Sequence, residues 1–505
     1  MKAFNRSSVE ASPVIILLLG CAVTAHLYAL FVSVLPTWFG GYDDQRLVLC
    51  ALLVCQMLGC LVFNFLSHQP LFGVWRFNWP LLLFGSSFLV LALFFRASSY
   101  ALTESTFYLL FFLAIPSVSA FLSTDDRLQP VVLAVILFSA ASCFVYAAMT
   151  FNIYLFAMFD GLARIDSVIP WGSVNIRYWS HLATWLLPLL PLALLSKSAE
   201  EYRLCRLGVL FAGGVWWWIV LVSGARGTLL GISVAMASVW FLFGRASLRY
   251  LRLQGLLLFL GLGIWVFASR VIPELLALDV EQRSFGTGSS GRLGLWNEAW
   301  LMSLKNFPLG MGPQAWLTHE WLGNGGEPKR FGHPHNMYLM WAAEYGWLLL
   351  GFFLFLVSRA IWILRRGMIC EMGKDFTSNQ NLIAFLASVI AALTHAGFSA
   401  IFIAPASMLL GAVILPTCWA LIVATAEEAP KISAPIKGRF ARPLQGALIA
   451  VGACLMVFWL HSVYSYLQES EKDRHLYKQD EKGEQFPRFW LHGNFPRLDT
   501  APAKQ

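Results

Sequence analysis

The run FGHPHNMY (331–338) brings histidine and asparagine side chains to the point where a long polar loop meets an apolar run of membrane length. His335 and Asn336 follow Pro334, so we expect them in the first turn of the next helix, where free N–H groups and the helix dipole favour an anion. Gly346 lies eleven positions after His335, close to three helical turns, and would let a neighbouring helix approach the same face. Chemistry on a lipid-borne substrate would have to occur at such a boundary.

A tight turn elsewhere in the chain also suits an anion. The turn SGARG (223–227) lies between two apolar runs and carries Arg226 at its tip, although a turn needs glycine and serine rather than arginine. Glycine N–H groups and one guanidinium, which can bind two phosphate oxygens, would form a small phosphate cradle. A purely structural role for Arg226 is the alternative.

The loop 271–335 carries a second arginine in a comparable setting. Leu293, Trp296 and Trp300 recur at helical spacing, which predicts an amphipathic helix on the membrane surface that begins at Arg292. The N-terminus of such a helix would stabilise a bound anion through its dipole.

Arg177 and His181 lie in an aromatic setting at the end of the polar segment 151–178. One interpretation is an interfacial aromatic belt with an arginine whose head group reaches water. The other interpretation is that both side chains face a cavity that opens outward. The sequence leaves both open.

Metal-dependent chemistry is an alternative for these residues. His333 and His335 flank a proline and could hold a metal ion, but two histidines at this spacing are a weak signal. The close acidic pairs of the outer segments lack further ligands at a recognisable metal spacing. These pairs are Asp43 with Asp44, and Asp279 with Glu281. We therefore expect no metal and no cofactor, with arginine neutralising the phosphate charge.

The composition predicts that a polytopic bundle of transmembrane helices holds these residues. Of 505 residues, 58% are hydrophobic and only 13% are charged, so ordinary soluble domains could not bury the apolar surface. We predict an all-α fold of about 12–13 spans, with short amphipathic helices in a long outer loop. The expected spans are 13–37, 47–66, 79–95, 107–122, 130–150, 179–196, 206–223, 228–244, 255–270, 336–357, 382–400, 404–424 and 445–464.

Lysine and arginine gather in alternate loops, which predicts the orientation through the positive-inside rule. With the N-terminus in the cytoplasm, the segments 151–178, 223–227, 271–335 and 465–505 lie outside. We predict a membrane domain over 1–464, whose outer loops 151–178 and 271–335 form the active site. The net charge of +8 reflects this sorting, so we expect no nucleic-acid partner.

The outer C-terminal tail, 465–505, is charged and rich in turns. Its aromatic residues Phe486, Trp490 and Phe495 are expected to dock on the membrane surface. Like the other outer segments, the tail is polar enough to contribute to an active site.

Together these motifs resemble those of the O-antigen ligase and polymerase superfamily, in order as well as in type, over roughly residues 170–425. The resemblance implies that Arg226 and Arg292 bind the pyrophosphate of an undecaprenyl-linked glycan, and that His335 is the essential histidine. The motifs that carry it are SGARG (223–227), SGRLGLW (290–296), GMGP (310–313) and HPHNMY (333–338), followed by Gly346.

The resemblance further implies an enzyme that transfers a glycan, without a metal, at the periplasmic face of the bacterial inner membrane. His335 is suited to take a proton from the acceptor hydroxyl as that group attacks and inverts the anomeric carbon. Arg226 and Arg292 would stabilise charge on the departing undecaprenyl pyrophosphate. The candidates for secondary roles in binding or orientation are Arg177, Arg283, Asn336, His333 and Tyr338.

Three functions remain open at this point. A ligase of lipopolysaccharide biosynthesis would pass a finished glycan to lipid A-core, whereas a polysaccharide polymerase would use another lipid-linked repeat unit as acceptor. Both need a lipid-linked donor and the surrounding membrane lipids as partners. A transporter or channel is the third, and it predicts charged residues facing one another near the middle of the membrane. Glu344 and His395 keep that function open.

Overall fold

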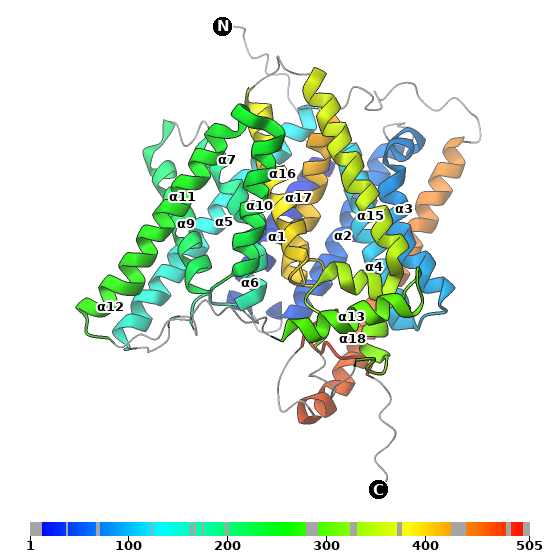
Figure 1. Cartoon of the computed structure of the whole chain (residues 1–505). Coiled ribbons are helices and arrows are strands. Elements are labelled where there is room, and N and C mark those ends of the chain that lie inside the picture. The colour runs from blue at the N-terminus through cyan, green and yellow to red at the C-terminus, as the bar shows by residue number, and fades with distance from the viewer. Residues whose placement is uncertain are drawn as a thin grey trace.

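The chain folds into a bundle of helices, and within the residues that the structure describes it contains no strand (Figure 1). This confirms the predicted all-α fold. The computed structural model describes residues 13–36, 39–66, 71–122, 125–161, 165, 168–173, 176–196, 201–278, 291–323, 331–370, 376–425, 441–480 and 486–497.

The helices follow one another with short connections. The first half of the chain contains α1 (Pro13–Phe31), α2 (Tyr42–Leu66), α3 (Leu71–Phe94), α4 (Ser99–Phe121), α5 (Asp125–Phe159), α6 (Ile176–Leu186), α7 (Leu190–Leu194), α9 (Arg203–Val222) and α10 (Arg226–Phe243). The second half contains α11 (Leu248–Val266), α12 (Ile272–Leu275), α13 (Arg292–Lys305), α14 (Ala315–Thr318), α15 (Met337–Cys370), α16 (Phe376–Ala396), α17 (Pro405–Ala424) and α18 (Ala441–Asp480).

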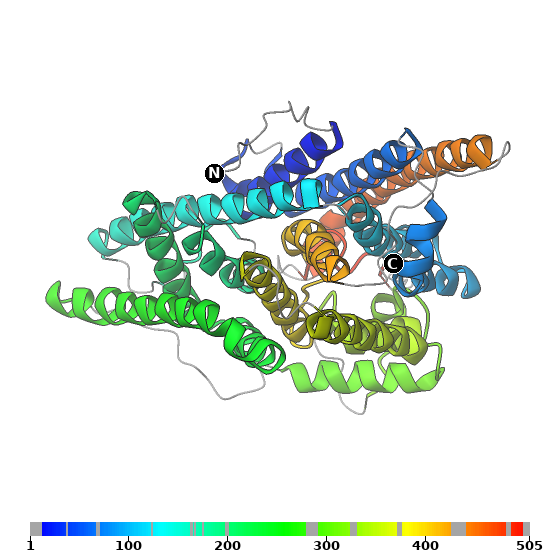
Figure 2. The same cartoon turned by 90° about the horizontal axis from the view of Figure 1, so that it is seen from above.

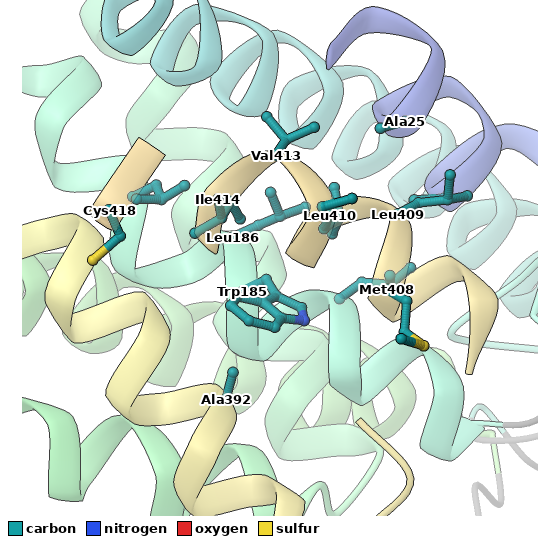
Figure 3. Packing of buried hydrophobic residues seen from close by; sticks show 14 of the residues in the cluster. Ala25, Trp185, Leu186, Ala392, Met408, Leu409, Leu410, Val413, Ile414 and Cys418 are labelled. Carbon is teal, nitrogen blue, oxygen red and sulfur yellow. The ribbon is translucent and has the colours of Figure 1, made fainter. Parts of the chain in front are cut away.

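Helix α17 forms the centre of the bundle, because it is apolar on every side and a helix of that kind is stable only when it is surrounded. It packs against α1, α2, α4 and α16, and the view from above shows it near the middle (Figure 2). Trp185 on α6 points into the same core (Figure 3). Its ring N–H donates to the Ser407 hydroxyl at 3.0 Å, and its carbonyl accepts from Ser388 at 2.6 Å.

Ten helical stretches in the described part of the chain are long and apolar enough to cross a membrane. One of them, Arg226–Leu275, contains two of the predicted spans, since the left-handed Gly244 turns the chain between α10 and α11. The predicted span 179–196 is broken into α6, a 3₁₀ turn and α7, because Pro188 and Pro191 cannot continue a regular helix. The remaining predicted span, 382–400, falls largely on α16.

The described parts of the predicted outer segments lie at one end of the bundle. Figure 1 shows α6, α13 and the end of α18 together at its lower edge. The predicted boundary after residue 464 falls inside α18, which continues to Asp480. A helix of 40 residues is about 60 Å long, twice the thickness of a hydrocarbon core, so its end projects beyond the other helices.

Gly346 bends α15 rather than receiving a neighbouring helix. Its φ is +83°, and a Cβ at this position would overlap the Pro308 carbonyl oxygen. The N–H of Met311 donates to the Ala343 carbonyl at 2.8 Å, and that of Trp347 donates to Pro308 at 2.8 Å. The prediction that Gly346 admits a second helix is therefore wrong, since a loop fills the space.

Replacing Gly346 with alanine is expected to destabilise the protein by at least about 2 kcal/mol, because the new Cβ is strained at positive φ and displaces the loop. The matched control is Gly351→Ala in the same helix, where an added Cβ meets no atom within 4 Å. That variant should stay within about 1 kcal/mol of the wild type. Thermal unfolding in detergent compares the two, and similar midpoints would refute this role of Gly346.

Candidate active site

The loop directly before α15 holds two histidines against each other. The backbone N–H of His335 donates to Nδ1 of His333 at 3.1 Å, and the ring centroids are 4.5 Å apart. His335 has a φ of +56°, in the left-handed region that histidine tolerates better than most residues, at a cost on the order of 1 kcal/mol. Because Nδ1 of His333 accepts this bond, the neutral His333 ring carries its proton on Nε2.

Asn336 is the N-cap of α15 and not part of its first turn. Its side-chain oxygen accepts from the backbone N–H groups of Tyr338 and Leu339, both at 3.0 Å. His335 therefore lies just outside the helix, and the prediction that both residues occupy the first turn is wrong. Tyr338 is tied elsewhere, since its hydroxyl donates to the Leu393 carbonyl of α16 at 2.6 Å.

Three arginines lie in the N-terminal turns of three helices around this loop. Arg177 is the second residue of α6, and Arg226 and Arg292 are the first residues of α10 and α13. The charges of Arg177 and Arg226 both act on Arg292. Those of Arg177 and Arg292 act on His335. Distant parts of the chain thus converge, and the helix N-termini add to the positive potential.

Burial and the neighbouring charges set the protonation of the site. Burial, together with Arg177, Arg292 and His181, lowers the pKa of His335 to about 3. Burial, together with Arg177 and Arg226, lowers the pKa of Arg292 to about 10. At physiological pH the imidazole is therefore neutral while the guanidinium groups stay charged and repel one another. An anion bound among them would relieve this repulsion.

Two nitrogen atoms of this cluster are buried and have no hydrogen-bond partner within the described residues. They are Nε2 of His335 and Nε of Arg292. Leaving a buried polar atom without a partner costs about 1–3 kcal/mol, so these atoms indicate where a ligand would bind. The arrangement can hold an anion beside a neutral imidazole that is free to accept a proton.

An apolar cavity of about 1500 Å³ opens beside the site, between α10, α15, α16 and α17. Near the loop it is lined by Tyr338, Gly397 and Phe398, and the Phe398 ring lies 6.1 Å from Trp296, one turn after Arg292 on α13. Its lining is dominated by hydrophobic side chains, so a long hydrocarbon chain is the kind of ligand that it fits.

Residues 209–356 match the family model described as O-antigen ligase. The chain carries an O-antigen ligase domain. The match confirms the resemblance to the O-antigen ligase and polymerase superfamily, and it supports a glycosyltransferase of that type in a multi-pass membrane protein. A comparison with curated proteins found no match.

The O-antigen ligase domain contains Arg226, Arg292 and His335, the three residues that the sequence ranked first. Arg177 lies before the matched segment, yet its charge acts on the same histidine. Arg283, a secondary candidate, lies outside the described residues.

A buried polar network joins α6 and α16 beside the O-antigen ligase site. Nε2 of His181 lies 2.7 Å from the Ser399 hydroxyl, and Nδ1 of His395 lies 2.8 Å from the Thr184 hydroxyl. The two imidazole centroids are 5.2 Å apart. Gly227 lets His395 pack directly on the Arg226 turn, because a Cβ there would overlap the ring. His181 is thus part of the interior of the site, and the network fixes the turn that presents an arginine.

Glu344, which kept a transport function open, is paired with a residue that the sequence did not suggest. Arg488 donates to both carboxylate oxygens of Glu344, at 2.9 and 2.7 Å, and to Glu104 at 3.1 Å. All three side chains are buried. Two carboxylates in apolar runs demand a cationic partner, and this was the one available signal, but it does not say which arginine answers it.

The aromatic residues of the C-terminal segment dock on the protein, and the predicted docking on the membrane surface is wrong. Phe486 and Trp490 are buried, and the Phe495 ring lies 5.2 Å from Tyr100 and 6.1 Å from Tyr466. The physical reason is that the buried carboxylates of α4 and α15 draw the neighbouring arginine, and hence the whole segment, into the bundle.

Acidification is expected to destabilise the wild type more than a His335→Asn variant. The folded pKa of His335, about 3, lies below its ordinary value of 6.5, so the unfolded chain takes up this proton first as the pH falls from 6.5 toward 3. By linkage, this group alone removes about 2 kcal/mol of stability between pH 8 and pH 5. Thermal unfolding in detergent at both pH values measures the loss, and equal losses in the two proteins would contradict the expectation.

Proposed function

We propose that this protein is a glycosyltransferase of the O-antigen ligase type, which moves a glycan from undecaprenyl pyrophosphate to a lipid A-core acceptor at the periplasmic face of the inner membrane. The observation that carries the proposal is the convergence of Arg177, Arg226 and Arg292 around a buried, neutral His335. The family match over 209–356 supports the same type of reaction.

In the proposed reaction, an acceptor hydroxyl attacks the anomeric carbon while Nε2 of His335 takes its proton. The new C–O bond forms as the bond from that carbon to the diphosphate oxygen breaks, so the anomeric centre is inverted. Arg226 and Arg292 stabilise the charge that develops on the departing diphosphate, and they supply the positive charge that a metal ion supplies in other transferases.

Donor binding would prepare the base. Arg177 and Arg292 help to lower the pKa of His335 in the free protein, and a bound diphosphate would offset their charge and raise that pKa. The imidazole is then a weak base until the donor is in place. This favours proton transfer only when the leaving group is already held by arginine.

The carrier lipid suits the apolar cavity. We assign the isoprenoid chain of the donor to the space between α10, α15, α16 and α17, which reaches Phe398 beside α13. A chain there would bring its diphosphate toward Arg292, the first residue of α13. Burial of such a chain contributes about 0.8 kcal/mol for each methylene group removed from water.

A polymerase shares the donor chemistry and differs only in its acceptor, so it is the second candidate. A transporter is less favoured, because Glu344 is held in a buried ion pair by Arg488 and His395 lies in the last turn of α16. The charged residues that a transporter would use are thus occupied in packing the bundle.

Deleting the gene and identifying the accumulated lipid-linked glycan tests the function. A ligase predicts long, finished glycan retained on its carrier lipid, with lipid A-core left bare. A polymerase instead predicts single repeat units. Normal amounts of finished lipopolysaccharide and of every other surface glycan would refute both.

A further inference from the structure

The C-terminal segment 486–497 packs directly against the loop that carries the two histidines. The ring of Phe486 lies 4.8 Å from that of Phe331. Gly332 allows the two backbones to touch, since a Cβ there would lie 2.6 Å from the Phe486 carbonyl oxygen and 3.0 Å from Cβ of Arg488. The loop is therefore in contact with a segment that lies about 150 residues later in the chain.

Arg488 links this segment to three other parts of the protein. Its guanidinium donates to Glu344 on α15 and to Glu104 on α4, and its third nitrogen approaches the Gly332 carbonyl at 3.5 Å. Glu344 in turn accepts from the backbone N–H of Trp316 at 3.1 Å. One side chain thus ties the histidine loop to α15, to α4 and to the loop before it.

The backbone of the segment is held just as firmly. The hydroxyl of Tyr42 donates to the Arg488 carbonyl at 2.6 Å, and Nε of Arg46 donates to the Phe489 carbonyl at 3.0 Å. The N–H of Leu491 donates to Asp43 at 2.6 Å. Arg46 and Arg488 are each 1% exposed, and together they balance the two buried glutamates.

We propose that Arg488 is a positioning residue, and that the segment 486–497 is a structural part of the active site that holds His335 in its left-handed conformation. This inference rests on the proposed function for its effect on catalysis, but not for its effect on the loop. A planar fork that contacts two carboxylates and a loop carbonyl together has no equivalent in lysine, which carries its charge at a point.

The test uses Arg488→Lys in the purified full-length protein, with diethyl pyrocarbonate as a probe of unprotonated, accessible imidazole. Because the loop should open more often, acylation of His335, followed by mass spectrometry, is expected to be about tenfold faster than in the wild type. The kcat of glycan transfer should fall by about 10²-fold, since small misplacements of a catalytic group cost that much. KM should change less than about threefold.

The matched control is Arg497→Lys in the same segment, whose guanidinium bonds to Asp473 at 2.9 Å on α18. Its acylation and transfer rates should equal those of the wild type. Should Arg488→Lys not fold, Gly332→Ala makes the same test without touching a charge, because it pushes the loop away from the Phe486 carbonyl.

Unchanged acylation of His335 in a folded variant would overturn the proposal, whatever the transfer activity. Faster acylation with undiminished transfer would leave the positioning of the loop intact and instead remove His335 from the proposed reaction. The two failures are therefore distinguishable.

Discussion

Replacing His335 with asparagine is expected to lower the kcat of glycan transfer by about 10²–10⁴-fold, the usual contribution of a general base. Asparagine removes the proton acceptor but tolerates the positive φ of this position, so the loop should keep its conformation. Binding of a lipid-diphosphate donor should change little, because the arginines remain. Transfer kinetics and donor binding, measured on the same purified protein, separate the two effects.

A control for the loss of an imidazole is His475→Asn, at an exposed position on α18. It should transfer glycan at the wild-type rate. If the His335→Asn protein retained a kcat within about threefold of the wild type, the role of His335 as base would be abandoned.

The second large effect is expected from Arg226→Ala and Arg292→Ala, each of which should lower kcat/KM by about 10²–10³-fold, as removal of one group that stabilises a leaving oxygen does elsewhere. Lysine at either position should recover little, because it cannot bind two phosphate oxygens in a fork. Loss of Arg292 has a further consequence. It removes one of the charges that lower the pKa of His335, so that pKa should rise.

The control for loss of an arginine is Arg245→Ala, an exposed residue just beyond the opposite end of α10 from Arg226. Its kinetics should be those of the wild type. Full recovery of kcat/KM by Arg226→Lys would show that a point charge is sufficient and would refute bidentate binding of the diphosphate.

Much of the fold followed from local pattern. Runs such as α17, with apolar residues on every side, have one stable environment, so their number and order are readable from the chain. The breaks inside them were harder to foresee. Gly346 gave no local signal that it would adopt a φ of +83°, since glycine within an apolar run also serves close helix packing.

The site divides along the same line. Arg226 and Arg292 were visible because an arginine at a turn or a helix start has a local physical meaning. The partner of Glu344 was not, because Arg488 is 144 positions away and its pairing depends on how α4, α15 and the C-terminal segment fold together. Asn336 was placed one position too far into its helix, since the pattern alone does not separate an N-cap from a first turn.

The most direct measurement of whether His335 and the arginines share one donor site is photo-crosslinking with an undecaprenyl diphosphate sugar that carries a diazirine on its first residue. Adducts are predicted in the peptides that contain 331–338 and 291–296, and an excess of the unmodified lipid diphosphate should abolish them. Adducts confined to the opposite end of the bundle, around 243–252, would contradict the shared site.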